Sequence, residues 1–495
     1  MTYKSTRDSN LKITSAEAIA RGISAEGGLF LPEEIPTITL EEIKEFSALP
    51  YSARATKIFK KFLTDFTDEE IEMCTKNAYS TKNFETENIT EIAKLDNKYL
   101  LELWHGKTCA FKDMALQILP YLLVVSAKKL NISKEIVILV ATSGDTGKAA
   151  LEGFKDIKGT RIIVFYPEDG VSPMQKKQMI TQYGDNVLVC AVKGNFDDCQ
   201  NGVKAIFADK DTETALSTLN CQLSSANSIN WGRLAPQIIY YISAYADLIE
   251  KGEIADGEKI NIVVPTGNFG NILAAYYAKK MGLPINKLIC ASNKNKILTD
   301  FLSTGVYDCN REFYTTSSPS MDILISSNLE RLLYLLSDDE SIKNWFDQLK
   351  KTGKYQVNSD VLNKLQEEFY GGFCDDKETQ DTIKSVFKEY NYLADTHTAV
   401  GIKVYDDYVS KTDDKTKTLI ASTANPYKFS QAVLQALGGN ISADEFTQIE
   451  EIENISNLTI PKSLADLKEK SPIYKDIISK DDMKNYVLNY IKSSK

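Results

Sequence analysis

Apolar residues follow two alternating patterns from about residue 135 onward. Short continuous runs rich in β-branched residues predict buried strands, and the 3.6-residue spacing of segments such as 148–156 and 271–282 predicts helices between them. Parallel strands covered on both faces give continuous apolar runs, so the pattern predicts an α/β fold built from βαβ units. The predicted strands span residues 135–142, 161–167, 186–192, 260–266, 287–292 and 418–423.

The spacing of these runs predicts two α/β lobes, because a helical stretch near 200–255 separates two groups of strands. A charged stretch with helical periodicity interrupts the second group, and it shows no strand pattern. The predicted parts are a mostly helical segment at 1–95, a smaller lobe at 96–235, a larger lobe at 236–325 and 393–445, a helical insertion without strands at 326–392 and a helical segment at 446–495.

Composition narrows the possible ligands and surroundings. The formal net charge of -10 favours neither nucleic acid nor an anionic membrane, so any anionic ligand needs local donors. The eight cysteines form no C-x-x-C pair, the two histidines are too few for a histidine-rich metal centre, and the first residues show no signal-peptide pattern. We therefore expect a cytoplasmic monomer or small homo-oligomer with reduced thiols, no metal, and neither nucleic-acid nor membrane partners.

Two loops of small residues follow predicted strands and open helices. They are SGDTG at 143–147 and TGNFGN at 266–271. Such a loop lets backbone N–H groups approach an anion, which the helix dipole also favours. Either loop alone is equally well explained as a tight turn. Together they indicate a ligand with two anionic groups, or a phosphorylated cofactor beside a carboxylate substrate.

The stretch HGKTCAFKD at 105–113 carries two lysines. A phosphate-binding P-loop needs glycine five residues before Gly106, where this chain has Leu101, and SGDTGK fails by the same spacing. Lys112, which precedes an apolar helical run, is expected to be partly desolvated. Desolvation lowers the pKa of an amine and prepares it for Schiff-base formation. A solvated lysine at a helix N-terminus is the commoner explanation for an isolated lysine.

Taken together, these motifs resemble the threonine synthase family of pyridoxal-phosphate-dependent enzymes of fold type II. H-G-x-T-x-A-F-K-D, SGDTG, GNFGN and STANP occur in order, and the opening segment at 5–36 also matches. The resemblance implies a two-lobed, tryptophan-synthase-β-like fold with the helical insertion of the longer bacterial and fungal-type subgroup. Further similar segments lie at 172–179, 194–200, 227–237, 318–331 and 395–401.

The resemblance also implies an activity, conversion of O-phospho-L-homoserine and water to L-threonine and phosphate by a carbon–oxygen lyase. Lys112 matches the catalytic lysine that forms the Schiff base, and Thr423 matches the hydroxyl residue facing the pyridine nitrogen. The implied cofactor-binding residues are Lys112, Asp145, Gly267, Asn268, Phe269, Gly270, Asn271 and Thr423. The implied substrate-binding residues are Lys107, Ser143, Gly144, Thr146, Asn230 and Arg233, with Lys294 and Arg331 less favoured.

The chain departs from the family pattern at two positions: Asn425 stands where histidine is common, and Thr396 where proline is common. Asparagine cannot titrate near neutral pH. Cys109 is interpreted as a packing residue and His397 as structural. Two other functions stay open: a fold type II lyase or deaminase acting on serine or threonine, which needs no phosphate donors, and a catalytically silent α/β binding protein.

Overall fold

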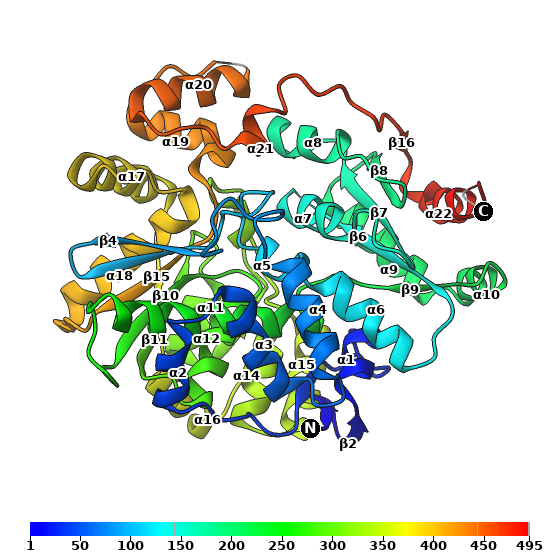
Figure 1. Cartoon of the computed structure of the whole chain (residues 1–495), viewed down its shortest axis with the longest axis horizontal. Helices are drawn as coiled ribbons and strands as arrows, with labels where there is room; N and C mark the ends of the chain where they lie inside the picture. The colour runs from blue at the N-terminus through cyan, green and yellow to red at the C-terminus, as the bar shows by residue number, and fades with distance from the viewer. Residues whose placement is uncertain (143, 170, 443, 494–495) are drawn as a thin grey trace.

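The computed structural model describes residues 1–142, 144–169, 171–442 and 444–493. Two sheets with helices around them form two lobes, as Figure 1 shows. The six predicted strands are confirmed, each within two residues of its expected bounds. They are β6 (Glu135–Ala141), β7 (Thr160–Pro167), β8 (Val187–Val192), β10 (Ile260–Pro265), β11 (Ile285–Ser292) and β15 (Thr418–Ser422).

The sheet of the smaller lobe has the order β16-β8-β7-β6-β9, and all its strands are parallel. Every residue of β7 is buried, which explains its uninterrupted apolar run. The other elements of this lobe are β9 (Cys221–Ser224), β16 (Ile477–Ile478), α6 (Leu119–Lys129), α7 (Asp145–Phe154), α8 (Pro173–Ile180), α9 (Phe196–Ala208), α10 (Lys210–Thr218), η3 (Lys480–Asp482) and α22 (Met483–Ser493).

The sheet of the larger lobe has the order β14-β11-β10-β15-β5-β4 and is parallel except for β4, which runs antiparallel to β5. Its remaining strands are β4 (Glu91–Leu95), β5 (Lys98–Glu102) and β14 (Phe369–Phe373), and its helices include α11 (Trp231–Glu250), α12 (Gly270–Met281), α13 (Ile297–Thr304), α18 (Thr396–Thr412), η2 (Pro426–Phe429), α19 (Ser430–Leu437), α20 (Glu445–Ser456) and α21 (Lys462–Ala465).

The N-terminal segment begins with a small antiparallel sheet of order β2-β1-β3 before its helices. Its elements are β1 (Tyr3–Ser5), β2 (Asp8–Ile13), α1 (Ser15–Arg21), β3 (Phe30–Pro32), α2 (Leu40–Phe46), α3 (Tyr51–Phe62) and α4 (Asp68–Ala78). The 326–392 segment contains α14 (Leu329–Leu336), α15 (Asp339–Thr352), β13 (Lys354–Gln356), α16 (Ser359–Glu368), β14 and α17 (Asp376–Tyr390), and β13 pairs with β12 (Val306–Asp308).

The expectation of an insertion without strands is therefore wrong. The edge strand β14 reads FYGGF, and its two glycines remove the apolar run that marks a buried strand. The β4–β5 hairpin belongs to the larger sheet, although the predicted smaller lobe begins at 96. The C-terminal segment also contains β16, which pairs with β8 of the smaller sheet. An edge strand pairs with its sheet through backbone hydrogen bonds, which any side chain permits. The sequence pattern of such a strand is therefore weak.

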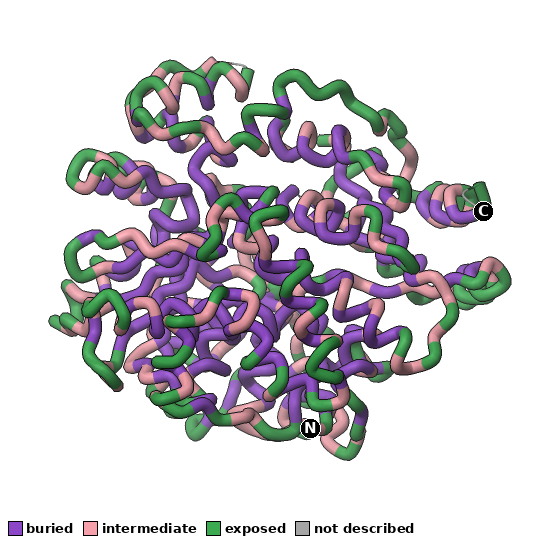
Figure 2. Tube along the Cα trace, viewed as in Figure 1, coloured by how far each residue is buried: buried purple, intermediate pink, exposed green. Residues whose placement is uncertain are grey.

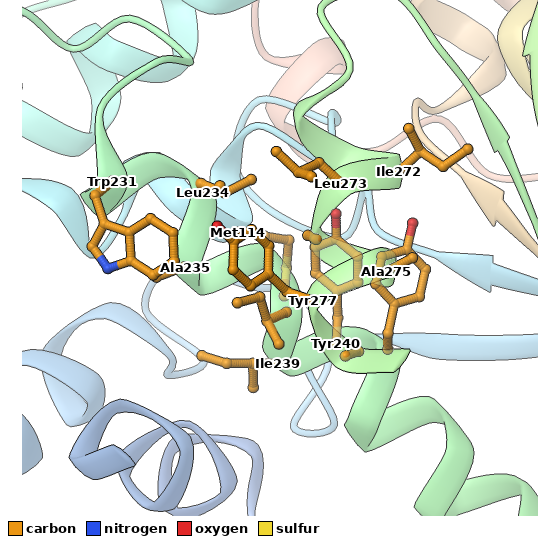
Figure 3. Close-up of a cluster of buried hydrophobic side chains, with 14 of the residues drawn as sticks. Met114, Trp231, Leu234, Ala235, Ile239, Tyr240, Ile272, Leu273, Ala275 and Tyr277 are labelled. Carbon is orange, nitrogen blue, oxygen red and sulfur yellow. The ribbon is translucent and has the colours of Figure 1, made fainter. Parts of the chain in front are cut away.

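A continuous apolar core lies behind the larger sheet and under the first helix after Lys112, α5 (Asp113–Leu116). Figure 2 shows the buried chain concentrated in this region. Figure 3 draws Met114 of α5 among side chains of α11 and α12, including Trp231 and Tyr277. This core fixes the helix after Lys112 relative to the helix opened by the 266–271 loop.

Two structural absences apply to the described ranges of the chain. No helix there is long and apolar enough to cross a membrane. No group of three or more histidine, cysteine, aspartate or glutamate side chains is arranged there to hold a metal ion.

The close approach of α7 to α5 depends on Gly153. A Cβ atom at this position would lie 2.0 Å from the carbonyl oxygen of Leu116. We predict that Gly153→Ala destabilises the protein by about 1–3 kcal/mol, because backbone must move to admit the methyl group. The measurement is the melting temperature of the purified protein, which should fall.

Gly232→Ala in α11 is the matched control, since a Cβ atom there meets the tip of the Leu119 side chain at 2.7 Å instead of backbone. A flexible side chain can move aside, so the control should lower the melting temperature by clearly less. Equal melting temperatures for the two variants would contradict the importance of the contact between Gly153 and Leu116.

Candidate active site

A cavity of about 490 Å³ opens where the carboxyl ends of β6, β10 and β15 meet. Ligands of open α/β sheets bind at this end of the strands, because the connecting loops diverge there. Many of the residues singled out in the sequence come together in its wall. These are Lys112, Asp145, Thr146, Arg233, Gly267, Asn268, Phe269, Gly270, Asn271 and Thr423.

The loop that carries Lys112 is held on both sides. The buried carboxylate of Asp113 accepts hydrogen bonds from the backbone N–H and the hydroxyl of Thr108, both at 2.8 Å. Across the loop, the N–H of Phe111 donates to the carbonyl of Thr423 at 2.8 Å. The bond to Thr423 holds the lysine loop at the end of β15, since Thr423 directly follows that strand.

The amine of Lys112 lies in the cavity and contacts two polar groups. Its Nζ donates to the hydroxyl of Ser320 at 3.2 Å and lies 3.6 Å from Oδ2 of Asp145. Burial lowers the pKa of this amine below its ordinary value, although Asp145 acts in the opposite direction. An amine with a lowered pKa is available both for bonding to an aldehyde and for moving protons.

Asp145 is the most strongly ion-paired carboxylate of the cavity. Its Oδ1 lies 2.7 Å from Nζ of Lys428 and accepts a hydrogen bond from Gln175 at 2.9 Å. Burial alone raises a carboxyl pKa, but Lys428 and Lys112 hold the pKa of Asp145 well below its usual range. Asp145 is therefore ionised at neutral pH.

The 266–271 loop forms an anion cradle at the start of α12. Phe269 adopts a left-handed conformation with φ of 65°, directly before the first helical residue, Gly270. At Gly267 a Cβ atom would lie 2.5 Å from the carbonyl oxygen of Ser320, so a larger residue does not fit. The first two residues of α12, Gly270 and Asn271, line this end of the cavity, and an anion is favoured at the N-terminus of a helix.

Asn271 adds a side-chain donor to the cradle. The hydroxyls of Tyr240 and Tyr241, both in α11, donate to its Oδ1. This fixes the orientation of the amide group and leaves Nδ2 as its free end. That nitrogen is buried and has no hydrogen-bond partner among the described residues, while Asn271 lines the cavity. A buried donor without a partner indicates a missing acceptor.

Arg233 provides a second cationic group in the same cavity. The residue is 3% exposed, and one guanidinium nitrogen donates to the carbonyl of Ala226. Its Nε is buried without a hydrogen-bond partner among the described residues. Burial lowers the pKa of Arg233 to about 10, and no carboxylate in the described ranges pairs with it. A buried guanidinium without a carboxylate is a site for a bound anion.

Three of the predicted substrate-binding residues lie elsewhere. Lys107 pairs with Glu152 at 3.4 Å outside the cavity. Asn230 caps α11 through the N–H of Gly232 and donates to the carbonyl of Ile19, so both ends of its amide are engaged. The N–H of Gly144 donates to the side chain of its neighbour Thr142. These residues lie near the predicted loops in sequence. In the structure, however, their polar groups form an ion pair or hydrogen bonds within the protein.

The other predicted residues are Ser143, Arg331 and Lys294, and neither Arg331 nor Lys294 is among the described residues that line the cavity. Ser143 lies outside the described residues. Arg331 is fully buried and donates to the carbonyls of Phe30 and Ile229, which makes it structural. Lys294 lies over the ring of Tyr314, with its amine 3.9 Å from the ring centre.

Both departures from the family pattern have a structural explanation. Asn425 does not line the cavity, and its Oδ1 accepts a hydrogen bond from the N–H of Tyr427, capping η2. Thr396 is the first residue of α18, where the N–H needs no partner within the helix. Proline and threonine both suit that position. Neither departure therefore alters the cavity wall.

Several cavity residues were missed from sequence. Ser320 and His397 lie in its wall, and Nε2 of His397 accepts from the N–H of Ser320 while Nδ1 lies 3.0 Å from Asp395. Lys204 and Gln200 of α9 line the opposite side, and their four-residue spacing on one helix face was a usable signal. His397 thus has the structural role expected of it and also borders the ligand space.

Comparison with known proteins identifies the family. The family described as pyridoxal-phosphate dependent enzyme matches residues 78–423, and those described as threonine synthase N terminus and threonine synthase, C-terminal match residues 2–79 and 398–487. Threonine synthase of Saccharomyces cerevisiae is 38% identical over 489 residues, covering 92% of this chain and 93% of the yeast protein. This chain belongs to the threonine synthase family.

A solved structure of a threonine synthase with bound pyridoxal phosphate, from Brucella melitensis, is 34% identical. It superposes with a TM-score of 0.88 over 100% of this chain and 99% of its own. The Homo sapiens protein threonine synthase-like 1 is 41% identical over 436 residues, which cover 85% of this chain. The chain spans 58% of the length of that longer relative.

The cavity fits the cofactor of this family. A phosphate group needs several N–H donors in a tight concave loop, and the anion cradle supplies backbone donors together with the unpartnered Nδ2 of Asn271. An aldehyde needs a lysine with a lowered pKa, and Lys112 lies in the same cavity. Both requirements are met by residues whose positions the core and the strand ends fix.

Removing the hydroxyl of Tyr241 tests the orientation of Asn271. We predict that Tyr241→Phe raises the dissociation constant of pyridoxal phosphate about two- to tenfold, because one hydrogen bond that fixes the amide is lost. The measurement is a titration of the apoprotein with the cofactor.

Tyr277→Phe is the matched control, since Tyr277 of α12 is also buried and its hydroxyl has no partner among the described residues. The control should bind the cofactor as the wild type does. If Tyr241→Phe bound equally well, Asn271 would not be held by this tyrosine.

Proposed function

We propose that this protein is a pyridoxal-phosphate-dependent lyase that converts O-phospho-L-homoserine and water to L-threonine and phosphate. The observation that carries the proposal is the buried guanidinium of Arg233, which has no carboxylate partner in the described part of the chain. It lies in the same cavity as Lys112 and the anion cradle. One anion site suits the phosphate of the cofactor, and Arg233 suits the phosphate of the substrate.

In this proposal Lys112 would bond to the cofactor, and residues 267–271 would hold its phosphate. Asp145 and Thr423 would border its ring. A hydroxyl at Thr423, instead of a carboxylate, would leave the pyridine nitrogen largely unprotonated. Bound pyridoxal phosphate supplies an electron sink that acidifies the carbons next to the amino group of the substrate. Thr146, which lines the cavity, would bind the substrate carboxylate.

Lys112 is the proposed base for successive proton transfers. Its uncharged amine takes the proton from Cα of the substrate and then serves the neighbouring carbon, because both lie within reach of one flexible side chain. The bond between Cγ and the phosphate oxygen breaks, and phosphate leaves with the electron pair. Lys112 then returns a proton to Cγ, which becomes the methyl group of threonine. The hydroxyl of water adds at Cβ, its other proton ends on the released phosphate, and a proton returns to Cα. Arg233 stabilises the phosphate as its charge increases on leaving.

We further propose that the protein works in the cytoplasm, as a monomer or small homo-oligomer and without nucleic-acid partners. Supporting this, no disulfide joins the cysteines in the described ranges. The net charge of -10 disfavours binding to nucleic acid.

Replacing Lys112 tests the chemistry. We predict that Lys112→Ala lowers the rate of threonine and phosphate formation from O-phospho-L-homoserine about 10²–10⁴-fold, the range expected for loss of a proton-transferring group. The assay follows phosphate and threonine together. If the wild type deaminates serine or threonine but releases no phosphate, it is a different lyase. If it binds neither cofactor nor substrate, the silent binding protein is correct.

Arg233 and Lys107 can be separated by substitution, since both are predicted phosphate ligands and only Arg233 of the two lines the cavity. Arg233→Ala should raise KM for O-phospho-L-homoserine about 10- to 100-fold, because charge-assisted hydrogen bonds to the phosphate are lost. Lys107→Ala, which removes a half-exposed ion pair, should change KM by less than about twofold. Arg233→Lys keeps the positive charge and should retain part of the affinity for the substrate, which separates loss of the phosphate contact from misfolding. A larger effect of Lys107→Ala would reverse the assignment.

A further inference from the structure

Lys428 and Asp145 form a buried ion pair behind Lys112, and Lys428 has no role in the proposed reaction steps. Lys428 lies in η2, and its side chain is 0% exposed. Its Nζ lies 2.7 Å from Oδ1 of Asp145 and donates to the carbonyl of Thr108 at 2.7 Å. Lys428 does not line the cavity. It therefore reaches Asp145 from behind, where neither cofactor nor substrate lies.

The two oxygens of Asp145 have different partners. Oδ1 receives Lys428 and the amide of Gln175, whereas Oδ2 faces Lys112 at the longer distance of 3.6 Å. A buried carboxylate needs a close counter-ion. If Lys428 were absent, Lys112 would be the cation left to fill that need. It would then be held as a permanent ammonium ion, which can neither bond to an aldehyde nor accept a proton.

We propose that Lys428 is a positioning residue that neutralises Asp145 from behind the cavity and so allows Lys112 to exist as an uncharged amine. Asp145 can then remain ionised beside the ligand without trapping the lysine that the reaction needs. The proposal rests on the assignment of Lys112 as the lysine that bonds to pyridoxal phosphate.

The other charged groups around Lys112 are consistent with Lys428 as the main counter-ion of Asp145. Asp145 of α7, Lys428 of η2 and Arg233 of α11 act on its amine electrostatically, and both cations favour the uncharged form. Lys204 of α9 lines the same cavity and adds positive charge at its edge. Asp145 is thus the opposing charge, and Lys428 pairs with it more closely than Lys112 does.

Two further titratable groups of the cavity wall are engaged elsewhere. Asp322 accepts hydrogen bonds from Asn293, Asn295 and Thr316, which tie it into its own loop. His397 lies between the N–H of Ser320 and the carboxylate of Asp395. In the described ranges, Asp145 is the carboxylate within ion-pair distance of Lys112.

The test is the protonation of Lys112 itself, measured on the full chain after removal of pyridoxal phosphate. Competitive acetylation across a pH series, read by mass spectrometry, gives the midpoint at which Lys112 becomes reactive. In Lys428→Met we expect this midpoint to rise by about one pH unit or more, because Asp145 then pairs with Lys112 alone. In the holoenzyme Lys112 is bonded to the cofactor until substrate displaces it, so the same shift should be seen in the acid limb of kcat, which reports the substrate complex.

Lys148→Met is the matched control. Lys148 of α7 is a largely buried lysine with an 11% exposed side chain. It pairs with Glu152 at 3.1 Å, is bonded to Gln182 and does not line the cavity. Its loss disturbs the fold in a similar way but does not touch Asp145. The midpoint of Lys112 should stay at the wild-type value in this variant.

A second pair of variants decides the question if Lys428→Met does not fold. Asp145→Asn should lower the midpoint of Lys112, since Lys428 then faces it unopposed, and adding Lys428→Met should raise the midpoint again. Equal midpoints with and without Lys428 in either background would overturn the proposal. If the midpoints shift as expected but the wild type forms no threonine, the proposed function fails while the electrostatic role of Lys428 stands.

Discussion

The buried carboxylate of Asp145 connects the two lobes at the point where the ligand space opens. It comes from the first helix after β6 of the smaller sheet, whereas its close partner Lys428 follows β15 of the larger sheet. Lys112 lies on the loop joined to the same strand end. Because a buried charge without its partner is strongly destabilising, this contact holds the lobes in register around the cavity. The glycine loops and the α11–α12 core lie around this contact.

The protein has a net charge of -10, but its cavity contains hydrogen-bond donors suited to anions. Backbone N–H groups at the start of α12, the amide of Asn271 and the guanidinium of Arg233 supply donors where the surface as a whole would repel an anion. Burial makes these few groups stronger than the same groups in water. The arrangement suits two phosphate-bearing molecules bound together, one held permanently and one released as product.

Features that repeat along a segment were predictable from sequence, and features made by single distant contacts were not. The continuous apolar runs predicted β6 and β10, and the TGNFGN loop after β10 predicted the anion cradle. The second cationic group, Arg233, lies on α11 and not in the SGDTG loop after β6. The edge strand β14, with two glycines, carries no such run. Nothing in the segment STANPYKF distinguishes Lys428 from an ordinary lysine, because its partner Asp145 lies in the other lobe. Asn230 has the residue type of a ligand donor, but the start of a helix uses both ends of its amide.

The central claim is that the cavity breaks a carbon–oxygen bond of the substrate and adds water at the neighbouring carbon. Incubating the holoenzyme with O-phospho-L-homoserine in heavy-oxygen water tests it most directly, with mass spectrometry of both products. We expect one heavy oxygen in threonine and none in the released phosphate. Heavy oxygen in the phosphate, with homoserine as the organic product, would show cleavage between phosphorus and oxygen and would rule out the proposed elimination.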